Sequence, residues 1–273
     1  MKHRLQIPLF LLILLLSGGC KKNSEADLSP DLNVADDVVI AESAYNHAVE
    51  NLLRALADPV LNSTCHSVID SANVVYVPGD NKYIFYFNSK MSPDSVIRNG
   101  TVEMYRTGNL SDTGTFFRIF FQNLVEYRNL ITGYDSVVYR GIDDHGKMVF
   151  VNYITDGVIH KMLELITWTS TNSFRVDPVL FQSGNVLNYY INGIAAGTSS
   201  KGHDFTAEIG DSLIYADPCP WIGQGTIRLK IPGADISTGF VDFITGDGCT
   251  NRIKYDFEGN YFYLWNDNVY LVN

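Results

Sequence analysis

The sequence predicts an all-β fold, mainly an antiparallel meander in the form of a sandwich or an open barrel, preceded by one amphipathic α-helix. From residue 72 onward, β-branched and aromatic residues alternate with polar ones, as in half-buried strands. Short stretches of Gly, Asp, Asn and Pro separate these segments, and no helix of crossover length lies between them, which excludes a parallel βαβ fold. The 273 residues are 46% hydrophobic, which is enough to bury a sizeable core.

The first expected hairpin has Val75 and Val77 on one strand and Tyr83, Phe85 and Phe87 on the next, around a turn at 78–81. Further turns are expected at 108–109, 143–146, 156–157, 232–233, 246–248 and 258–260. The remaining strands are expected at 101–106, 115–127, 136–140, 147–154, 158–168, 186–194, 204–209, 213–215, 226–231, 239–245, 251–257, 261–265 and 269–272.

Residues 35–60 have helical periodicity. Apolar residues such as Val38, Ala41 and Tyr45 recur at steps of three and four, and Asp58 and Pro59 end the pattern. We expect the apolar stripe to pack on the following β domain, because helices that lie on membranes are usually rich in Lys and Arg, and this one is acidic. The other face carries Glu42, Asn46, Glu50 and Arg54.

The first 19 residues have the order of an export signal. Lys2, His3 and Arg4 precede an apolar run of about ten residues, roughly half of what a membrane-spanning helix requires. Small residues and Cys20 follow, and the stretch 16–20 resembles the lipobox of bacterial lipoproteins, in which the cysteine sulfur is acylated after cleavage. Residues 20–34 are polar and read as a flexible tether.

The charge of the chain limits its partners. With 30 acidic and 20 basic residues the net charge is −10, opposite in sign to that of a typical nucleic-acid binder. Removal of the signal, with Lys2 and Arg4, leaves 18 basic and 30 acidic residues, so acyl chains of the palmitate type on Cys20 would have to anchor the protein to the membrane. We expect no nucleic-acid partner.

Residues 98–102, 166–170, 193 with 197 and 198, 217–222, 225–227, 241–243, 246–253 and 258–260 form a recognisable pattern. Through these residues the β domain, residues 64–273, resembles a family of uncharacterised outer-membrane lipoproteins from Bacteroidota. It implies a β-rich exported domain behind a lipid anchor, and no established activity. A cysteine followed by alternating aromatic strands also recurs around Cys65 and Cys219, which indicates an internal repeat with its C-terminal copy at 217–273.

The resemblance also implies a disulfide between Cys219 and Cys249, which fits an oxidising compartment. The alternative is two reduced, buried thiols. The position near Phe87, where the family pattern places a partner for Cys65, holds no cysteine here, so Cys65 is expected to be unpaired or to pair between chains.

The search for catalytic chemistry yields little. His66 beside Cys65 would point to the opposite face of a strand, and the cluster at 143–146 is explained by a β-turn. No histidine pair has metal-ligand spacing, and neither a G-x-S-x-G elbow nor a glycine-rich phosphate loop is present in the sequence. We therefore expect no catalytic residues, no metal and no cofactor.

Two surface features remain. Alternation places Tyr261, Tyr263 and Trp265 on one face of a strand, where they form a candidate face for a glycan or a protein partner, although such rows are more often core. The Asp-Ser tripeptides resemble the O-glycosylation acceptor of exported Bacteroidota proteins, although Asp and Ser are also common at strand-entry turns. The acceptor serines are Ser71, Ser95, Ser136 and Ser212.

We expect a non-enzymatic, lipid-anchored binding or structural module of the outer membrane, on either its cell-surface or its periplasmic face. One alternative is a periplasm-facing carrier that holds a hydrophobic ligand in its curved sheet, with residues 37–57 as a lid and with Phe116, Ile119 or Phe120 lining the pocket. Another is an enzyme of unrecognised class, for which Asp144 and His145 are the best candidate pair.

Overall fold

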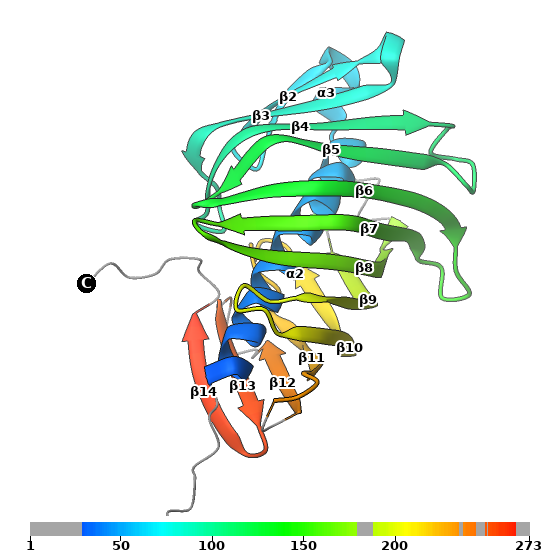
Figure 1. Ribbon diagram of the computed structural model, residues 1–273. Helices are drawn as coiled ribbons and strands as arrows, with labels where there is room; N and C mark the ends of the chain where they lie inside the picture. Colours follow the sequence, from blue (N-terminus) through cyan, green and yellow to red (C-terminus); the bar gives the residue numbers. More distant parts are fainter. Residues whose placement is uncertain (1–28, 179–187, 235–236, 244–248, 250, 266–273) are drawn as a thin grey trace, which may run out of the picture.

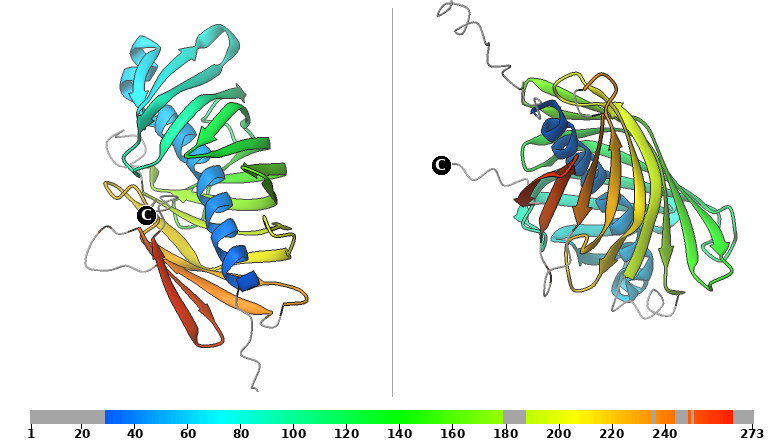
Figure 2. Two further views of the ribbon diagram at one scale, coloured as in Figure 1. Left: turned by 60° about the vertical axis from the view of Figure 1, so that its left-hand side comes forward. Right: turned by 90° about the horizontal axis from the view of Figure 1, so that it is seen from below.

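Over the residues that the structure describes, the chain forms one open antiparallel sheet of fourteen strands that curls around a long helix (Figures 1 and 2). The computed structural model describes residues 29–178, 188–234, 237–243, 249 and 251–265. Each strand pairs with its neighbours in the chain, from β1 to β14, so the sheet is a continuous meander. The predicted fold class, all-β with one N-terminal helix, is confirmed, and the form is that of an open sheet.

The helical elements are α2 (Ser29–Ala57), α3 (Pro59–Thr64) and the short 3-10 helix η1 (Pro78–Asp80). The strands of the first half are β1 (His66–Ile69), β2 (Ala72–Val77), β3 (Lys82–Met91), β4 (Ile97–Thr107), β5 (Phe116–Glu126), β6 (Asn129–Ile142) and β7 (Met148–Lys161). Those of the second half are β8 (Glu164–Val176), β9 (Asn188–Thr198), β10 (Asp204–Ala216), β11 (Gln224–Lys230), β12 (Thr238–Phe243), β13 (Arg252–Phe257) and β14 (Asn260–Trp265).

Helix α2 ends where the sequence predicts. The side chain of Asp58 accepts hydrogen bonds from the backbone N–H groups of Val60 and Leu61, which caps α3, and Pro59 occupies the first turn of α3. These two residues stop α2 at Ala57 and let the chain turn into the sheet. The sequence prediction includes neither α3 nor β1, because its helix ends by residue 60 and its first strand is the one that carries Val75 and Val77.

Helix α2 lies on the concave side of the sheet and contacts strands from both halves, including β1, β7, β8 and β13. Its apolar stripe packs on the sheet as expected. Its polar face is also enclosed, because Glu42 and Asn46 are each 4% exposed and Asn51 is 2% exposed. A sheet that curls around a helix covers more than one helix face, so polar residues of α2 must find partners on the strands.

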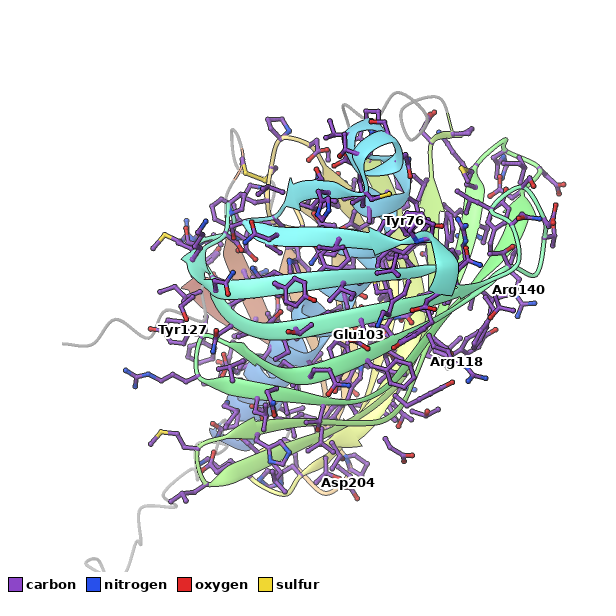
Figure 3. All side chains as sticks on the ribbon, turned by 90° about the horizontal axis from the view of Figure 1, so that it is seen from above. Tyr76, Glu103, Arg118, Tyr127, Arg140 and Asp204 are labelled. Carbon is purple, nitrogen blue, oxygen red and sulfur yellow. A yellow bond between two sulfur atoms is a disulfide. The ribbon has the colours of Figure 1, made fainter. Side chains whose placement is uncertain are left out.

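The core fills the space between α2 and the concave face of the sheet. Aromatic residues at alternate positions of neighbouring strands point inward, and Phe85, Phe117, Phe150 and Phe174 are fully buried. The opposite face of the sheet carries the polar half of the same alternation. Arg118 and Arg140, labelled in Figure 3, are exposed on this convex side. The period-two pattern in the sequence thus corresponds to residues that point alternately to the concave and the convex face of the sheet.

One predicted turn is wrong. Asp156 and Gly157 lie inside β7, where the register with β8 shifts between Ile154 and Gly157, and the chain reverses at Met162 and Leu163. A β-carbon on Gly157 would lie 2.7 Å from the Tyr45 hydroxyl oxygen, so the Asp-Gly pair serves a bulge that lets α2 approach the sheet closely.

The strands predicted at 204–209 and 213–215 form a single strand, β10, whose pairing with β11 contains register shifts. The strand predicted at 158–168 is divided between the end of β7 and the start of β8. The strand predicted at 269–272 lies outside the described residues. The proposed internal repeat remains a prediction.

Candidate functional site

A pocket of about 550 Å³ lies where the two halves of the sheet approach each other over the C-terminal half of α2. We call it the seam pocket. Its floor is the polar stripe of α2, one wall comes from β1 and the β3–β4 loop, and the other comes from β9, β10 and the β10–β11 loop. Its polar and aromatic lining includes Ser43, Asn46, His47, Glu50, Arg54, Asp58, Asp70, Asp94, Tyr189, Tyr215, Asp217 and Trp221.

On one side of the pocket, Arg54 of α2 joins two carboxylates. Its Nε donates a hydrogen bond to Glu50 Oε1 at 2.9 Å, and its Nη2 donates to Asp217 Oδ1 at 2.7 Å and to the Tyr215 hydroxyl at 2.8 Å. The Tyr189 hydroxyl donates to Glu50 Oε2 at 3.1 Å, and the rings of Tyr189 and Tyr215 stack with centroids 4.7 Å apart. Helix, strands and loop are therefore joined in one cluster, the Arg54 cluster.

On the other side, His47 of α2 lies between two carboxylates. Its Nε2 is 2.5 Å from Asp70 Oδ2 and its Nδ1 is 3.4 Å from Glu126 Oε1. Behind it, the buried guanidinium of Arg98 pairs with Glu126 at 2.9 Å, with Asp94 at 2.6 Å and with Asp70 at 3.6 Å. This group, the His47 cluster, connects α2 with the β1–β2 turn, the β3–β4 loop, β4 and β5.

The carboxylates fix the charge state of His47. Burial and the nearby Arg98 oppose a positive imidazole, but Asp70 and Glu126 outweigh them and raise the pKa of His47 to about 10. Burial likewise opposes ionisation of Asp70, whereas His47 and Arg98 lower the pKa of this carboxyl below its ordinary value. The cluster thus pairs the His47 imidazolium and the Arg98 guanidinium with three carboxylates.

The mouth of the pocket is bounded by two loops that touch. The Trp221 indole Nε1 donates a hydrogen bond to the backbone carbonyl of Asp94 at 3.3 Å. The Trp221 loop is tied to the segment after β12 by the disulfide between Cys219 and Cys249, whose Cα atoms are 5.3 Å apart. The predicted disulfide is confirmed, and it fastens the loop whose Pro218, Pro220 and Trp221 line the pocket.

A second polar group lies deeper, between α2 and the middle of the sheet. Glu42 Oε1 accepts hydrogen bonds from Asn46 Nδ2 at 2.9 Å and from Asn172 Nδ2 at 2.8 Å. Burial raises the pKa of Glu42 to about 7, although these two hydrogen bonds lower it. On the adjoining strands Asn152 and Ser170 are buried, and within the described part of the chain their side chains have no hydrogen-bond partner.

The predicted aromatic row lies far along the meander, on the last strand. Tyr261 and Tyr263 are exposed, at 58% and 47% respectively. A basic side chain covers each ring: the Arg252 guanidinium lies 4.1 Å from the Tyr263 centroid and Lys254 Nζ lies 5.0 Å from that of Tyr261. Trp265 ends the same strand, paired in register with Arg252. The role of this row as a ligand face remains a prediction.

The four candidate glycosylation serines differ in accessibility. Ser95 is exposed in the β3–β4 loop beside Asp94, whereas Ser136 is 7% exposed on β6. Ser71 and Ser212 are half-buried, and the Ser212 hydroxyl donates to Asn192 Oδ1. Ser95 is therefore the serine that an enzyme could reach most readily.

The other singled-out residues lie away from the seam pocket. The stretch 143–146 forms the β6–β7 turn, in which the Asp143 carboxylate accepts hydrogen bonds from the N–H groups of His145 and Lys147. Cys65 is a half-buried free thiol that ends α3 in a left-handed conformation, and His66 is exposed. Cys20, the expected export signal and residues 20–28 of the expected tether lie outside the described residues. The rest of that tether, residues 29–34, was predicted wrongly, because it forms the first turns of α2.

No family model, curated protein or solved structure matches the chain. Among the described helices none is long and apolar enough to span a membrane. Within the same residues no group of three or more His, Cys, Asp and Glu side chains has an arrangement that could hold a metal ion.

Proposed function

We propose that this chain is a lipid-anchored protein of a bacterial outer membrane that acts as a non-enzymatic binding module, with the seam pocket as its ligand site. The observation that carries the proposal is the pocket itself: about 550 Å³, floored by a polar helix stripe and walled by three aromatic rings. Cavities of this size with a few convergent polar groups are typical of small-molecule sites. The sequence signals at residues 1–20 support the anchor.

The charges of the pocket favour binding over acid–base chemistry. A general base needs a free lone pair, but both ring nitrogens of His47 face carboxylate oxygens. Arg54 similarly holds Glu50 and Asp217 in fixed ion pairs. Groups arranged in this way hold the walls of a site in place and present a preset pattern of donors and acceptors to a ligand.

Ligand capture from the native envelope tests the proposal. The full chain would be extracted in mild detergent from its own bacterium and measured by native mass spectrometry, alongside Trp221→Ala and the control Tyr261→Ala. We expect a small non-covalent mass on the parent and on Tyr261→Ala that is lost in Trp221→Ala. Loss of that mass in Tyr261→Ala alone would move the binding site to β14, and the absence of any bound mass would contradict the proposal.

The membrane anchor has its own test. Metabolic labelling with a fatty acid that bears an alkyne should mark the parent chain and leave Cys20→Ala unmarked. Protease treatment of intact cells, compared with cells whose outer membrane has been permeabilised, then shows on which face a C-terminal tag lies. An unlabelled parent chain would contradict the lipid anchor but would not bear on the proposed ligand site in the seam pocket.

One observation favours the carrier as a second candidate function. The interface between α2 and strands β6–β8 buries polar groups, among them Asn152 and Asp135, which makes it less favourable than an apolar interface. Burial raises the pKa of Asp135 well above its usual range, partly offset by the N–H of Ser136. A helix held in this way could move out as a lid.

The pocket lining expected for the carrier is not found. Ile119 faces the core, whereas Phe116 and Phe120 are half-buried on the convex face, so the three cannot line one internal pocket.

Hydrogen exchange distinguishes a lid from a fixed helix. If α2 opens, its amides should exchange much faster than those of β7 under native conditions, and a ligand that displaces it should accelerate them further. Equal protection of α2 and β7 would show that both open only on global unfolding and would remove the carrier.

A further inference from the structure

We propose that the seam pocket recognises a primary ammonium group carried on a compact body the size of one sugar ring or one amino-acid side chain. The inference rests on the proposed binding function and specifies its ligand class. It follows from three features of the pocket: its charge balance, its aromatic wall and its size.

The charge balance is negative on both sides of the pocket. In the Arg54 cluster, one guanidinium meets two carboxylates, Glu50 and Asp217. In the His47 cluster, the imidazolium and Arg98 meet three carboxylates, Asp70, Asp94 and Glu126. Each cluster therefore holds one more carboxylate than cation.

Asp58 adds a further negative charge at the rim. Its oxygens accept hydrogen bonds from backbone N–H groups and from the Ser67 hydroxyl, none of which is charged. A ligand cation between the two clusters would neutralise part of this excess, whereas a carboxylate or phosphate would increase it. The net charge of the whole chain, −10, acts in the same direction at longer range.

The aromatic wall of the pocket already makes a cation–π contact with the Arg54 guanidinium. The guanidinium carbon of Arg54 lies 5.8 Å from the centroid of the Tyr215 ring, which stacks on Tyr189 with an interplanar angle of 6°. Trp221 lines the pocket from the loop opposite Asp94. Carboxylates flanking aromatic rings are the combination that binds ammonium groups, because the ring face and the anions attract the same charge.

Size sets the body of the ligand. A volume of about 550 Å³ lies within the range for small-molecule sites, so a monosaccharide or a single side chain fits inside the pocket. An ammonium group could come from an amino sugar or from the side chain of a basic amino acid. The chemistry recognised is the same, and matched probes separate the two sources.

Isothermal titration calorimetry of the purified full chain at pH 7 and low salt would compare two pairs of probes. The first is glucosamine against glucose, and the second is Nα-acetyl-lysine amide against its Nε-acetylated form. We expect at least one ammonium probe to bind with a Kd at least tenfold lower than that of its neutral partner, and to weaken several-fold in 0.5 M salt. The pair that shows the difference identifies the source.

Charge-neutralising variants locate the effect. Glu50→Gln and Asp217→Asn should each weaken the ammonium probe by fivefold or more and lower its preference over the neutral partner. Asp204→Asn, at the far end of β10 and exposed, is the matched control. Circular dichroism and thermal unfolding check that each variant folds. If one of the two carboxylate variants does not fold, the other still tests the proposal.

Several results would overturn the inference. Equal binding within both pairs, tighter binding of glucuronate than of glucosamine, or no binding of any probe would each contradict recognition of an ammonium group. If the native envelope still delivers a bound molecule that requires Trp221, the binding function stands and only the ligand class is wrong. If neither experiment finds a ligand, the binding function fails as well.

Discussion

Trp221 and Asp94 are 127 residues apart in the chain, yet the indole of the first donates a hydrogen bond to the backbone carbonyl of the second. Asp94 in turn holds Arg98, and through it the His47 cluster on α2. The disulfide at Cys219 holds the loop that carries Trp221. This contact between the two halves of the open sheet is thus built from residues that also line the seam pocket.

Breaking the disulfide should destabilise the fold and loosen the pocket. It closes a loop with a sequence separation of 30, for which the chain-entropy relation gives about 3 to 4 kcal/mol. We expect Cys219→Ser with Cys249→Ser to lower the free energy of unfolding by about that amount in urea titrations. Cys65→Ser, which removes the free thiol, should have little effect. Equal losses of unfolding free energy in the double variant and in Cys65→Ser would contradict a structural role for this bond.

Removal of Arg98 should be among the most damaging single changes. Its side chain is 1% exposed and compensates Glu126, Asp94 and Asp70. Arg98→Met would leave these carboxylates without their main counter-charge, at a cost of about 3 to 5 kcal/mol. Arg118→Met, on the exposed face of β5, should cost less than about 1 kcal/mol. Urea unfolding measures the free energy that each variant loses. Equal losses in Arg98→Met and Arg118→Met would contradict the view that the burial of its charge makes Arg98 important.

The stability of the fold should fall as the pH rises from 5 to 10. Glu42, with a pKa of about 7, keeps its proton when folded but loses it near 4.5 when unfolded, so stability declines between these values. The raised pKa of His47 stabilises the fold fully below about 6.5, and this contribution is lost as the pH rises through about 10. Each group accounts for at most about 1.4 kcal/mol per pH unit.

Acid should also destabilise the fold, from the opposite side. The pKa values of Asp70 and Glu126 lie below their ordinary values of 3.8 and 4.5, so their stabilisation is present above those values and is lost as the pH falls further. Urea titrations from pH 3 to 10 should therefore show a maximum in mild acid. Glu42→Gln should flatten the slope between pH 5 and 7, and an unchanged slope would show that Glu42 does not titrate there.

A methyl group at Gly157 should strain the contact between α2 and the sheet. It would lie 2.7 Å from the Tyr45 hydroxyl oxygen and 2.8 Å from the carbonyl oxygen of Trp168. We expect Gly157→Ala to cost about 1 to 3 kcal/mol, because packed interiors do not absorb an added carbon freely. Gly79→Ala, in η1 with no atom within 4 Å of the new carbon, should be neutral in thermal unfolding. Equal melting temperatures would contradict the tight approach.

The local pattern of the sequence predicts the fold well, since alternation, turn residues and the Asp58–Pro59 stop are all local signals. The prediction fails where residues with a turn-like composition serve a contact between elements that are distant in the sequence. Asp156 and Gly157 have the composition of a turn, but in the structure they form a bulge beneath Tyr45. The same limit explains why the split of β10 is wrong, since its irregular pairing leaves the strand continuous.

The seam pocket could not be predicted, because its residues come from five separate stretches of the chain and no short spacing connects them. Glu50 and Arg54 read as the polar face of an amphipathic helix, and Asp70 and Asp94 as turn residues. One signal was available: the stretch 217–222, with Asp217, Trp221 and the bonded Cys219, carries much of the family resemblance. Arg98 begins another stretch of that resemblance, 98–102, and pairs in register with Lys90 and Glu126, but no local signal in the sequence showed that its guanidinium would be buried.

A crystal structure of the protein purified from the organism that makes it, without added ligand, tests the central claim most directly. We predict electron density for a small molecule in the seam pocket, between Arg54, Tyr215 and Trp221. Density beside Tyr261 and Tyr263, or beneath a displaced α2, with the seam pocket holding only solvent, would contradict it.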